Sequence, residues 1–296
     1  MISQRALRAW AGTDRLSALS LDRLAALPIT RASAELALLV AGVDVPAAFL
    51  GPLDEDLEDL IEHRGELVHA RVAVLPTARG VIVCDRADAA DSPDRVCWPD
   101  DSSYHLARAI PPGRRASWLD LGCGSAFAML ERPELASRIV GVEINPRAVR
   151  DARLGAKLSG VERLELFEAD ATQLDPGERF ELVTCNPPMP AHEASGPRWR
   201  VADDATVRRM IARAGELVAP GGLVVVHAAL GAIDELPGES ILVAYTPEDE
   251  RQFGVMWWSP DGEPRKSLGR RALTPDRPHL DSADRDAARA GTLPWH

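Results

Sequence analysis

The feature that most constrains the fold of this chain is the alternation of apolar, strand-like runs with helical segments after residue 111. Short apolar runs bounded by turn residues are typical of strands, and the segments between them carry helical patterns. Strands separated by helices predict a mostly parallel sheet that helices cover on both faces. We therefore expect an α/β domain over residues 111–258. The runs that we interpret as strands are ASWLDLG, RIVGVEI, RLELFEAD, FELVTCN, GLVVVHA, ILVAYT and FGVMWW.

The rest of the chain divides into three regions by pattern. Residues 1–65 have apolar positions at helical spacing, which predicts a small helical N-terminal domain. Residues 66–110 shift toward a period of two and predict a β-hairpin around Pro76 and Gly80, followed by a bridging segment. Residues 259–296 are rich in Pro, Asp and Arg and poor in large apolar side chains, so we expect an irregular C-terminal extension.

Composition disfavours several classes of function. The formal net charge is −11, so the field of the whole molecule repels polyanions and disfavours a nucleic-acid partner. No run approaches about 18 uninterrupted apolar residues, and the first residues lack the apolar core of a signal peptide, so we expect a cytoplasmic protein without a membrane contact. The 4 cysteines are scattered without metal-ligand spacing, which predicts free thiols and no metal.

The first strand end, WLDLGCGSA, carries an acid and two glycines. In open parallel sheets, ligands bind beyond the carboxyl ends of the strands, so chemistry is expected there. Asp120 ends the strand, while Gly122 and Gly124 allow a tight turn and close backbone approach. A dinucleotide site would need a third glycine where Phe127 stands, and Asp120 would repel a diphosphate. A cationic, amino-bearing ligand fits better; tight packing without a ligand is the alternative.

The next two strand ends also carry carboxylates. Glu143 closes the second strand, at a place where a carboxylate typically accepts hydrogen bonds from both hydroxyls of a ribose. Asp170 and Ala171 follow the third strand and are placed to read an adenine edge. Asp170 could equally serve as the N-cap of a short helix that follows it. The two ends together favour a nucleoside as the ligand.

The fourth strand end, FELVTCNPPMP, stops at an amide side chain. Asn186 follows the apolar run, and Pro187, Pro188 and Met189 come next. Prolines end strands and begin turns, so a simple turn would explain part of this pattern. Pro187 also lacks a competing N–H and fixes the backbone, so that its own carbonyl points in one direction.

Taken in order, these four ends resemble those of the class I S-adenosylmethionine-dependent methyltransferases. Within that class, residues 100–258 are similar to the branch with an Asn-Pro-Pro-aromatic motif, and LVAPGGLVVV matches its Pro-Gly-Gly turn. This branch includes the protein glutamine N5-methyltransferases and related rRNA base N-methyltransferases. The resemblance implies a Rossmann-like, seven-stranded, mostly parallel sheet whose last strand is antiparallel, and S-adenosyl-L-methionine as the cofactor.

The resemblance also implies roles for the residues at the strand ends. Acceptors on both N–H bonds of the substrate nitrogen would hold it and favour its pyramidalisation as the new C–N bond forms. Asn186 and the carbonyl of Pro187 would supply them, and Asn186 would also lie against the cofactor. Pro188 and Met189 would contact the substrate. The cofactor-binding residues would be Asp120, Gly122 and Gly124 at the methionine end, Glu143 at the ribose, and Asp170 with Ala171 at the adenine.

Two departures from the family pattern bear on the substrate. Ala126 stands where the family has a third glycine, and Met189 replaces the aromatic ring that stacks on a planar acceptor. A methionine should stack on a planar acceptor more weakly than an aromatic ring does. Three hypotheses about the function therefore stay open. The favoured one is N-methylation of an amide or amino nitrogen, with a protein glutamine as acceptor. The alternatives are N-methylation of an rRNA base or a small metabolite, and a non-catalytic module that binds the cofactor.

Overall fold

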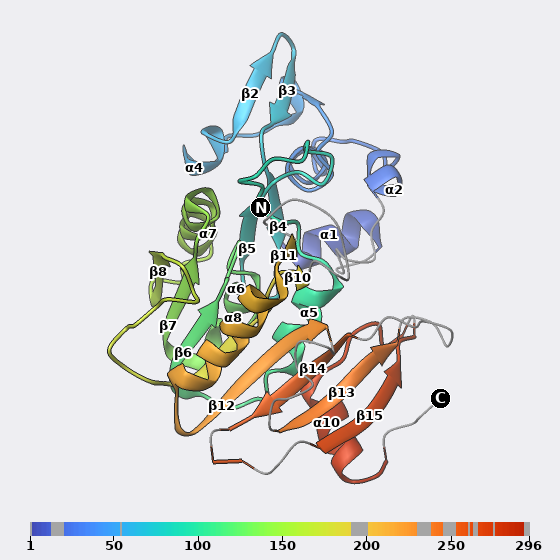
Figure 1. The fold of residues 1–296 in the computed structure, drawn as a ribbon. Helices are drawn as coiled ribbons and strands as arrows, with labels where there is room; N and C mark the ends of the chain where they lie inside the picture. The colour runs from blue at the N-terminus through green and yellow to red at the C-terminus, as the bar shows by residue number, and fades with distance from the viewer. Residues whose placement is uncertain are drawn as a thin grey trace. The chain divides into compact units, whose positions relative to one another are not determined.

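The computed structural model describes residues 2–12, 21–53, 55–190, 201–229, 238–244, 253–259, 261–262, 266–274 and 276–292 (Figure 1). The chain divides into two compact units, each discontinuous in sequence. The first comprises Met1–Asp100, Gly124–Arg132 and Asn145–Glu162. The second comprises Asp101–Cys123, Pro133–Ile144 and Arg163–His296. The four segments predicted from sequence therefore do not coincide with these units, and that division stays a prediction.

Helices and strands alternate between residues 101 and 168, whereas several strands follow one another before and after this part of the described chain. No helix of the described ranges is both long and apolar enough to cross a membrane. The helices are α1 (Gln4–Ala11), α2 (Leu21–Ala25), α3 (Ala34–Leu39), α4 (Glu55–Glu58), α5 (Asp101–Ala109), α6 (Phe127–Glu131), α7 (Pro146–Leu158), α8 (Asp204–Leu217) and α10 (Ser282–Arg289). The strands are β1 (Val45–Pro46), β2 (Ile61–Arg64), β3 (Leu67–Ala70), β4 (Ala73–Pro76), β5 (Val81–Cys84), β6 (Arg115–Leu121), β7 (Ala136–Glu143), β8 (Leu164–Glu168), β9 (Phe180–Cys185), β10 (Met189–Pro190), β11 (Val201–Ala202), β12 (Val218–Ala229), β13 (Glu239–Ala244), β14 (Phe253–Trp258) and β15 (Lys266–Ala272).

The second unit is built on an 8-stranded sheet in the order β15-β13-β14-β12-β9-β6-β7-β8. The five strands β12, β9, β6, β7 and β8 are parallel to one another. Strand β14 runs antiparallel to both β12 and β13. All seven predicted strands are present, and the antiparallel strand expected from the resemblance is confirmed. The predicted strand count of seven is wrong by one, because β15 pairs in parallel with β13.

The eighth strand corrects the expectation of an irregular extension over residues 259–296. The described part of this segment contains β15 and α10. The strand was hidden in the sequence because Arg271, at a buried position of β15, is only 3% exposed and pairs with the buried Asp284 of α10 at 3.1 Å. An inward-facing ion pair removes the apolar alternation by which a half-buried strand is recognised.

Helices cover both faces of this sheet, as two neighbouring tryptophans of β14 show. Side chains alternate between faces along a strand, so Trp257 and Trp258 point in opposite directions. Trp257 donates from Nε1 to the carbonyl of Ala109 in α5 at 2.8 Å, and Arg285 of α10 lies over its ring. Trp258 belongs to the core cluster that includes Leu217 of α8. Both rings are buried, because both faces are covered.

The first unit contains the predicted helical region and hairpin. Helices α1 to α4 lie within residues 1–65, but β2 also begins there and pairs with β3. The hairpin is confirmed, since β4 and β5 pair antiparallel on either side of the turn. Helix α7 belongs to the same unit, and the hydroxyl of Ser159 at its end accepts from the backbone N–H of Val81 at 2.9 Å. Strand β5 is thereby anchored to the end of α7.

Candidate active site

The pairing register of the second unit brings the four predicted strand ends to one edge of the sheet. Leu121 of β6 pairs with Cys185 of β9 and Val142 of β7, and Val142 pairs with Phe167 of β8. These four residues form one row across four neighbouring strands. Because neighbouring strands lie about 4.8 Å apart, the row spans roughly 15 Å. The predicted site residues of this unit follow or precede the row by no more than four positions.

Asp120 is a buried carboxyl within this edge, at 4% exposure. Its Oδ1 accepts a hydrogen bond of 2.6 Å from the hydroxyl of Thr184, to which the indole of Trp118 donates at 2.8 Å. Burial raises the pKa of Asp120 to about 7, the Thr184 hydrogen bond lowers it, and the neighbouring Glu143 carboxylate raises it. A cation placed beside Asp120 would favour the ionised form.

Thr184 and Trp118 are site residues that the sequence interpretation missed. Both lie on central strands and both are fully buried, so each needs a polar partner. The signal for Thr184 was present, since it is the only hydroxyl within the apolar run FELVTC. Paired in register with Asp120, it fixes the orientation of that carboxyl by hydrogen bonding.

The turn after β6 has the backbone that its glycines predict. Gly122 has φ 72° and Gly124 has φ 52°, both in the left-handed region. The N–H of Gly122 donates to the carbonyl of Val142 at 2.8 Å, and a Cβ on Gly122 would approach the terminal methyl of Met210 to 3.1 Å. Ala126 is the one non-glycine residue of the described chain with positive φ, at 62°, where the family has its third glycine.

Glu143 ends β7 and is half-buried, with Ile144 directly after it. The backbone carbonyl of Glu143 accepts from the N–H of Ala169 at 3.0 Å, which joins the second and third strand ends. Ile144 is 66% exposed, one of few large apolar side chains of the described chain that are open to solvent. A carboxylate beside an exposed apolar side chain suits a ligand with hydroxyls and a flat apolar ring. The sequence interpretation missed Ile144, although its place after the strand-ending acid was a signal.

Asp170 forms a tight set of local hydrogen bonds. Its Oδ1 accepts from the N–H and the hydroxyl of Thr172 at 2.8 and 2.7 Å, and its Oδ2 accepts from the amide of Gln173 at 3.0 Å. The hydrogen bonds from Thr172 hold the pKa of Asp170 below its usual value. The short helix expected after Asp170 is absent from these described residues, which form a turn. The adenine contact of Asp170 and of the buried Ala171 stays a prediction.

Asn186 follows β9 and both ends of its amide have partners. Its Nδ2 donates to the hydroxyl of Ser102 in α5 at 2.8 Å. Its Oδ1 lies 3.3 Å from Nδ1 of His227 in β12. Neither Ser102 nor His227 was singled out from the sequence, because their relation to Asn186 depends on pairing between distant segments.

The residues after Asn186 lead into a short paired strand. Pro187 is buried, while Pro188 and Met189 are half-buried. Met189 begins the two-residue strand β10, which pairs with Val201 of β11, so regular structure resumes sooner after the two prolines than the sequence indicates. The contacts of Asn186, Pro187, Pro188 and Met189 with a substrate stay predictions. His192, Glu193 and Trp199 follow soon after in sequence and could also contact a substrate, but they lie outside the described residues.

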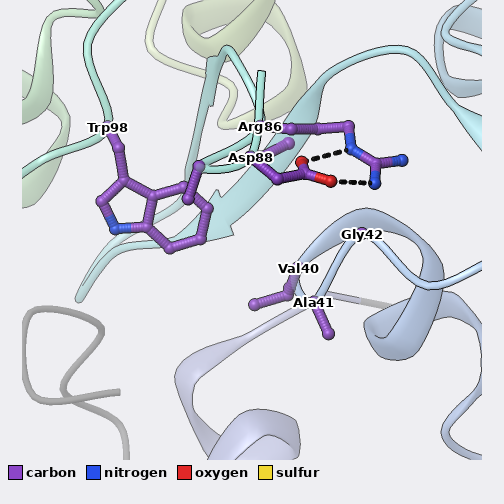
Figure 2. Close-up of a pocket in the computed structure, with 8 residues that line it drawn as sticks. Val40, Ala41, Gly42, Arg86, Asp88 and Trp98 are labelled. Carbon is purple, nitrogen blue, oxygen red and sulfur yellow. Dashed lines mark hydrogen bonds and ion pairs between the residues drawn. The ribbon is translucent and has the colours of Figure 1, made fainter. Parts of the chain in front are cut away.

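A recess in the first unit is a poorer candidate (Figure 2). It holds almost no space that a water molecule could enter, and the paired side chains of Arg86 and Asp88 lie at one side of it. Ligand pockets typically measure about 300–1,000 Å³, so the recess is too small for a nucleoside. Its labelled lining residues are Val40, Ala41, Gly42, Arg86, Asp88 and Trp98.

The chemistry of the strand-end residues fits S-adenosylmethionine. A buried carboxyl with a raised pKa suits a cation, as Asp120 provides, and Glu143 next to the exposed Ile144 suits a ribose and a base. Within the ranges that the structure describes, no group of three or more His, Cys, Asp and Glu side chains could hold a metal ion.

Comparisons with known proteins agree with this chemistry. The family model of the methyltransferase small domain matches residues 97–252. The chain is 34% identical over 97 residues to the ribosomal protein L11 methyltransferase of Thermus thermophilus, covering 33% of this chain and 37% of the relative. It is 37% identical over 127 residues to the release factor glutamine methyltransferase of Burkholderia pseudomallei, covering 35% and 44%. It is 28% identical over 116 residues to the ribosomal RNA large subunit methyltransferase F of Pseudomonas fluorescens, covering 34% of each.

The chain thus spans between a third and a half of the length of these curated relatives. The family match is broader, because it covers more than half of this chain and all four strand ends that carry predicted site residues. It agrees with the sheet topology and with the buried acid at the first strand end. The chain belongs to the methyltransferase small domain family.

Proposed function

We propose that this protein is a class I methyltransferase that uses S-adenosyl-L-methionine. We propose further that it methylates an amide or amino nitrogen, and that its acceptor is a glutamine side chain of a protein. The observation that carries the proposal is the position of Asn186, at the end of β9 and in the strand next to that of Asp120. One relative is named a release factor glutamine methyltransferase, and another is named a ribosomal protein L11 methyltransferase. The net charge of −11 also suits a protein acceptor better than RNA.

The cofactor, when bound, supplies a methyl group that its sulfonium has already activated. The task of the protein is then to bind and align the two reactants, and the transfer does not require a strong general base. Asp120 would compensate the positive charge at the methionine end, and Glu143 would accept from the ribose hydroxyls. The left-handed turn at Gly122 would let the backbone approach the ligand closely.

Asn186 would hold the acceptor nitrogen. An amide oxygen has two lone pairs, so Oδ1 can accept from a substrate N–H while His227 lies at its other lone pair. The carbonyl of Pro187 would accept from the second N–H. The nitrogen lone pair of an amide is delocalised, and two such acceptors would favour the pyramidal geometry needed as the C–N bond forms.

A second acceptor class is favoured by one feature of the site. Met189 stands where the related enzymes carry an aromatic ring, and it is half-buried in the structure. Aromatic stacking on a base is worth about 1–3 kcal/mol, which a methionine would only partly replace. This feature would suit a small-molecule amine, whose recognition needs no stacking platform.

The acceptor class can be tested by transfer of a tritiated methyl group. The enzyme would be incubated with labelled S-adenosylmethionine and with separate protein, RNA and small-molecule fractions of a cell extract. The proposal predicts label in the protein fraction, recovered after proteolysis as N5-methylglutamine. Label in RNA alone, or in small molecules alone, would contradict the glutamine assignment.

Replacing the amide tests the role of Asn186. Asn186→Ala should leave the affinity for S-adenosylmethionine within a few-fold and lower turnover by ~10²-fold or more, by analogy with loss of one preorganised polar contact. Binding is followed by calorimetry and turnover by the same tritium assay. An unchanged rate would show that Asn186 does not contact the acceptor.

A further inference from the structure

The geometry points to His227 as a positioning residue that fixes the orientation of the Asn186 amide. This inference rests on the proposed function, because it assigns His227 a role through the residue that would contact the acceptor. His227 lies in β12, which pairs with β9, and the registered pair Val226 and Cys185 immediately precedes His227 and Asn186. The two side chains therefore follow adjacent positions of neighbouring parallel strands.

The contact itself defines which ring nitrogen carries hydrogen. An amide oxygen only accepts, so Nδ1 of His227, at 3.3 Å from Oδ1 of Asn186, must be the donor. In its neutral form His227 is then the Nδ1–H tautomer. The ring is only 4% exposed, so water cannot readily replace this contact.

The second partner of Asn186 cannot set the orientation alone. Ser102 accepts from Nδ2 at 2.8 Å, but a hydroxyl can donate as well as accept. A flipped amide could therefore still bond to Ser102. It would place Nδ2 against the Nδ1–H of His227, where two donors would face each other. As the Nδ1–H tautomer, His227 therefore discriminates between the two orientations, whereas Ser102 does not.

Other rings hold His227 in place. It stacks on His105 with ring centroids 5.7 Å apart and planes 11° apart, and on Phe253 with centroids 6.2 Å apart and planes 1° apart. Nδ1 of His105 accepts from the N–H of Leu280 at 2.9 Å, and burial lowers the pKa of His105 to about 2. A neutral ring on one side and an aromatic ring on the other fix the plane of His227 without a charge.

The orientation decides whether Asn186 can act on the acceptor. With Oδ1 fixed toward His227, its remaining lone pair can receive a substrate N–H. With the amide reversed, an N–H donor would meet the substrate N–H instead. Loss of the histidine donor should therefore lower the rate of methyl transfer more than it weakens binding of the cofactor.

Two substitutions separate the N–H donor from the ring. His227→Phe keeps the stacked ring but removes the donor, whereas His227→Asn keeps an N–H close to the position of Nδ1. We expect His227→Phe to lower the single-turnover rate about tenfold or more, a loss smaller than or comparable to that of a direct catalytic contact. His227→Asn should recover most of that rate. The affinity of both for S-adenosylmethionine should stay within about twofold of the native protein.

The assay uses the tritiated cofactor with the extract fraction that the native enzyme labels, and calorimetry gives the cofactor affinity. If both variants bind the cofactor normally and react at the native rate, His227 does not position Asn186. A native rate for His227→Phe beside a slow rate for His227→Asn, both with normal binding, would assign the effect to the ring and also overturn the inference. A slow Asn186→Ala variant beside a normal His227→Phe variant would defeat only this inference. If Asn186→Ala is also normal, the proposed acceptor contact itself is wrong.

A second measurement on the native protein requires no acceptor and no folded variant. Two-dimensional NMR of the protein with 15N-labelled histidine distinguishes the two neutral tautomers by the shifts of the ring nitrogens. The inference predicts Nδ1–H for His227 and Nε2–H for His105, whose Nδ1 is an acceptor. Finding His227 as the Nε2–H tautomer would overturn it.

Discussion

Two regions of the second unit each bury a carboxyl, but they balance it differently. Asp284 of α10 is fully buried and pairs with Arg271 at 3.1 Å and with Arg277 at 2.7 Å. Asp120 at the end of β6 is almost as deeply buried and accepts from the hydroxyl of Thr184. Among the residues that the structure describes, no Arg or Lys forms an ion pair with Asp120.

We propose that the difference separates a structural acid from one that would bind a ligand. The ion pairs of Asp284 are internal, so they join α10 to β15 whether or not anything binds. At Asp120 the missing cation matches the charge of S-adenosylmethionine, and binding would supply it. A buried charge costs several kcal/mol when it is unpaired. Ionised Asp120 therefore carries an energetic cost that the ion pairs of Asp284 avoid.

The largest expected effect comes from unpairing the structural acid. Arg271→Ala would leave Asp284 buried, with the half-exposed Arg277 as its remaining ion-pair partner. Removing one partner of a buried pair typically costs ~3–5 kcal/mol, so the free energy of unfolding should fall by about 3 kcal/mol. Urea denaturation followed by circular dichroism measures the loss. A change below about 1 kcal/mol would show that the pair is not structural.

The matching change at the strand edge should affect binding instead of folding. Asp120→Asn keeps an oxygen that accepts from Thr184 but removes the charge that would meet the cofactor. We expect the affinity for S-adenosylmethionine to fall by about 2 kcal/mol, or roughly 30-fold, as for a hydrogen bond to a charged group. The free energy of unfolding near neutral pH should stay the same or rise. Calorimetry gives the affinity for S-adenosylmethionine and urea denaturation gives the free energy of unfolding. A large loss of stability with native affinity would show that Asp120, like Asp284, is a structural acid.

Because the pKa of Asp120 is raised, the free energy of unfolding and the affinity for the cofactor should depend on pH in opposite directions. The folded state binds this proton more tightly than the unfolded state, since the pKa rises from 3.8 to about 7. The contribution of Asp120 to the free energy of unfolding should therefore decline as pH rises from about 4 to about 7. Affinity for the cationic cofactor should increase about tenfold between about pH 6 and pH 8, as the carboxylate forms. Calorimetry at several pH values tests this, and Asp120→Asn should abolish the trend; an equally steep trend in that variant would refute the assignment.

The smallest effect concerns the backbone of the turn after β6. Ala126 has φ 62°, a backbone conformation that costs an L-residue about 1–2 kcal/mol. Glycine at this position would relieve the strain, but it would also raise the conformational entropy of the unfolded chain, which offsets part of the stabilisation. Ala126→Gly should therefore raise the free energy of unfolding by about 0.5 kcal/mol. Thermal unfolding measures the shift, and a decrease in stability would show that the Cβ of Ala126 contributes packing that outweighs its strain.

The sequence predicted the parallel part of the fold better than its edges. Apolar runs such as FELVTC mark buried strands directly, and the strand ends at Asp120, Glu143 and Asn186 do lie at one edge, because parallel pairing forces them there. Strand β15 was missed because Arg271 and Asp284 replace its apolar pattern with a buried ion pair. Pattern analysis detects apolar periodicity, and it cannot detect polar groups that find partners far away in sequence.

The same reasoning explains which site residues escaped prediction. Thr184 and His227 act on Asp120 and Asn186 across neighbouring strands, and such contacts depend on register. Ser102 reaches Asn186 from a helix that precedes the whole sheet in sequence. Motifs identified the residues expected to contact the cofactor and acceptor, whereas only the structure shows the residues that hold them in place.

The most direct test of this account is the pKa of Asp120 itself, with and without cofactor. In protein labelled with 13C at the aspartate carboxyls, the shift of Asp120 can be assigned with Asp120→Asn and followed with pH. The account predicts a pKa of about 7 in the free protein and a fall of at least one unit when S-adenosylmethionine is bound. A pKa that the bound cofactor leaves unchanged would contradict the claim that Asp120 is kept for its positive charge.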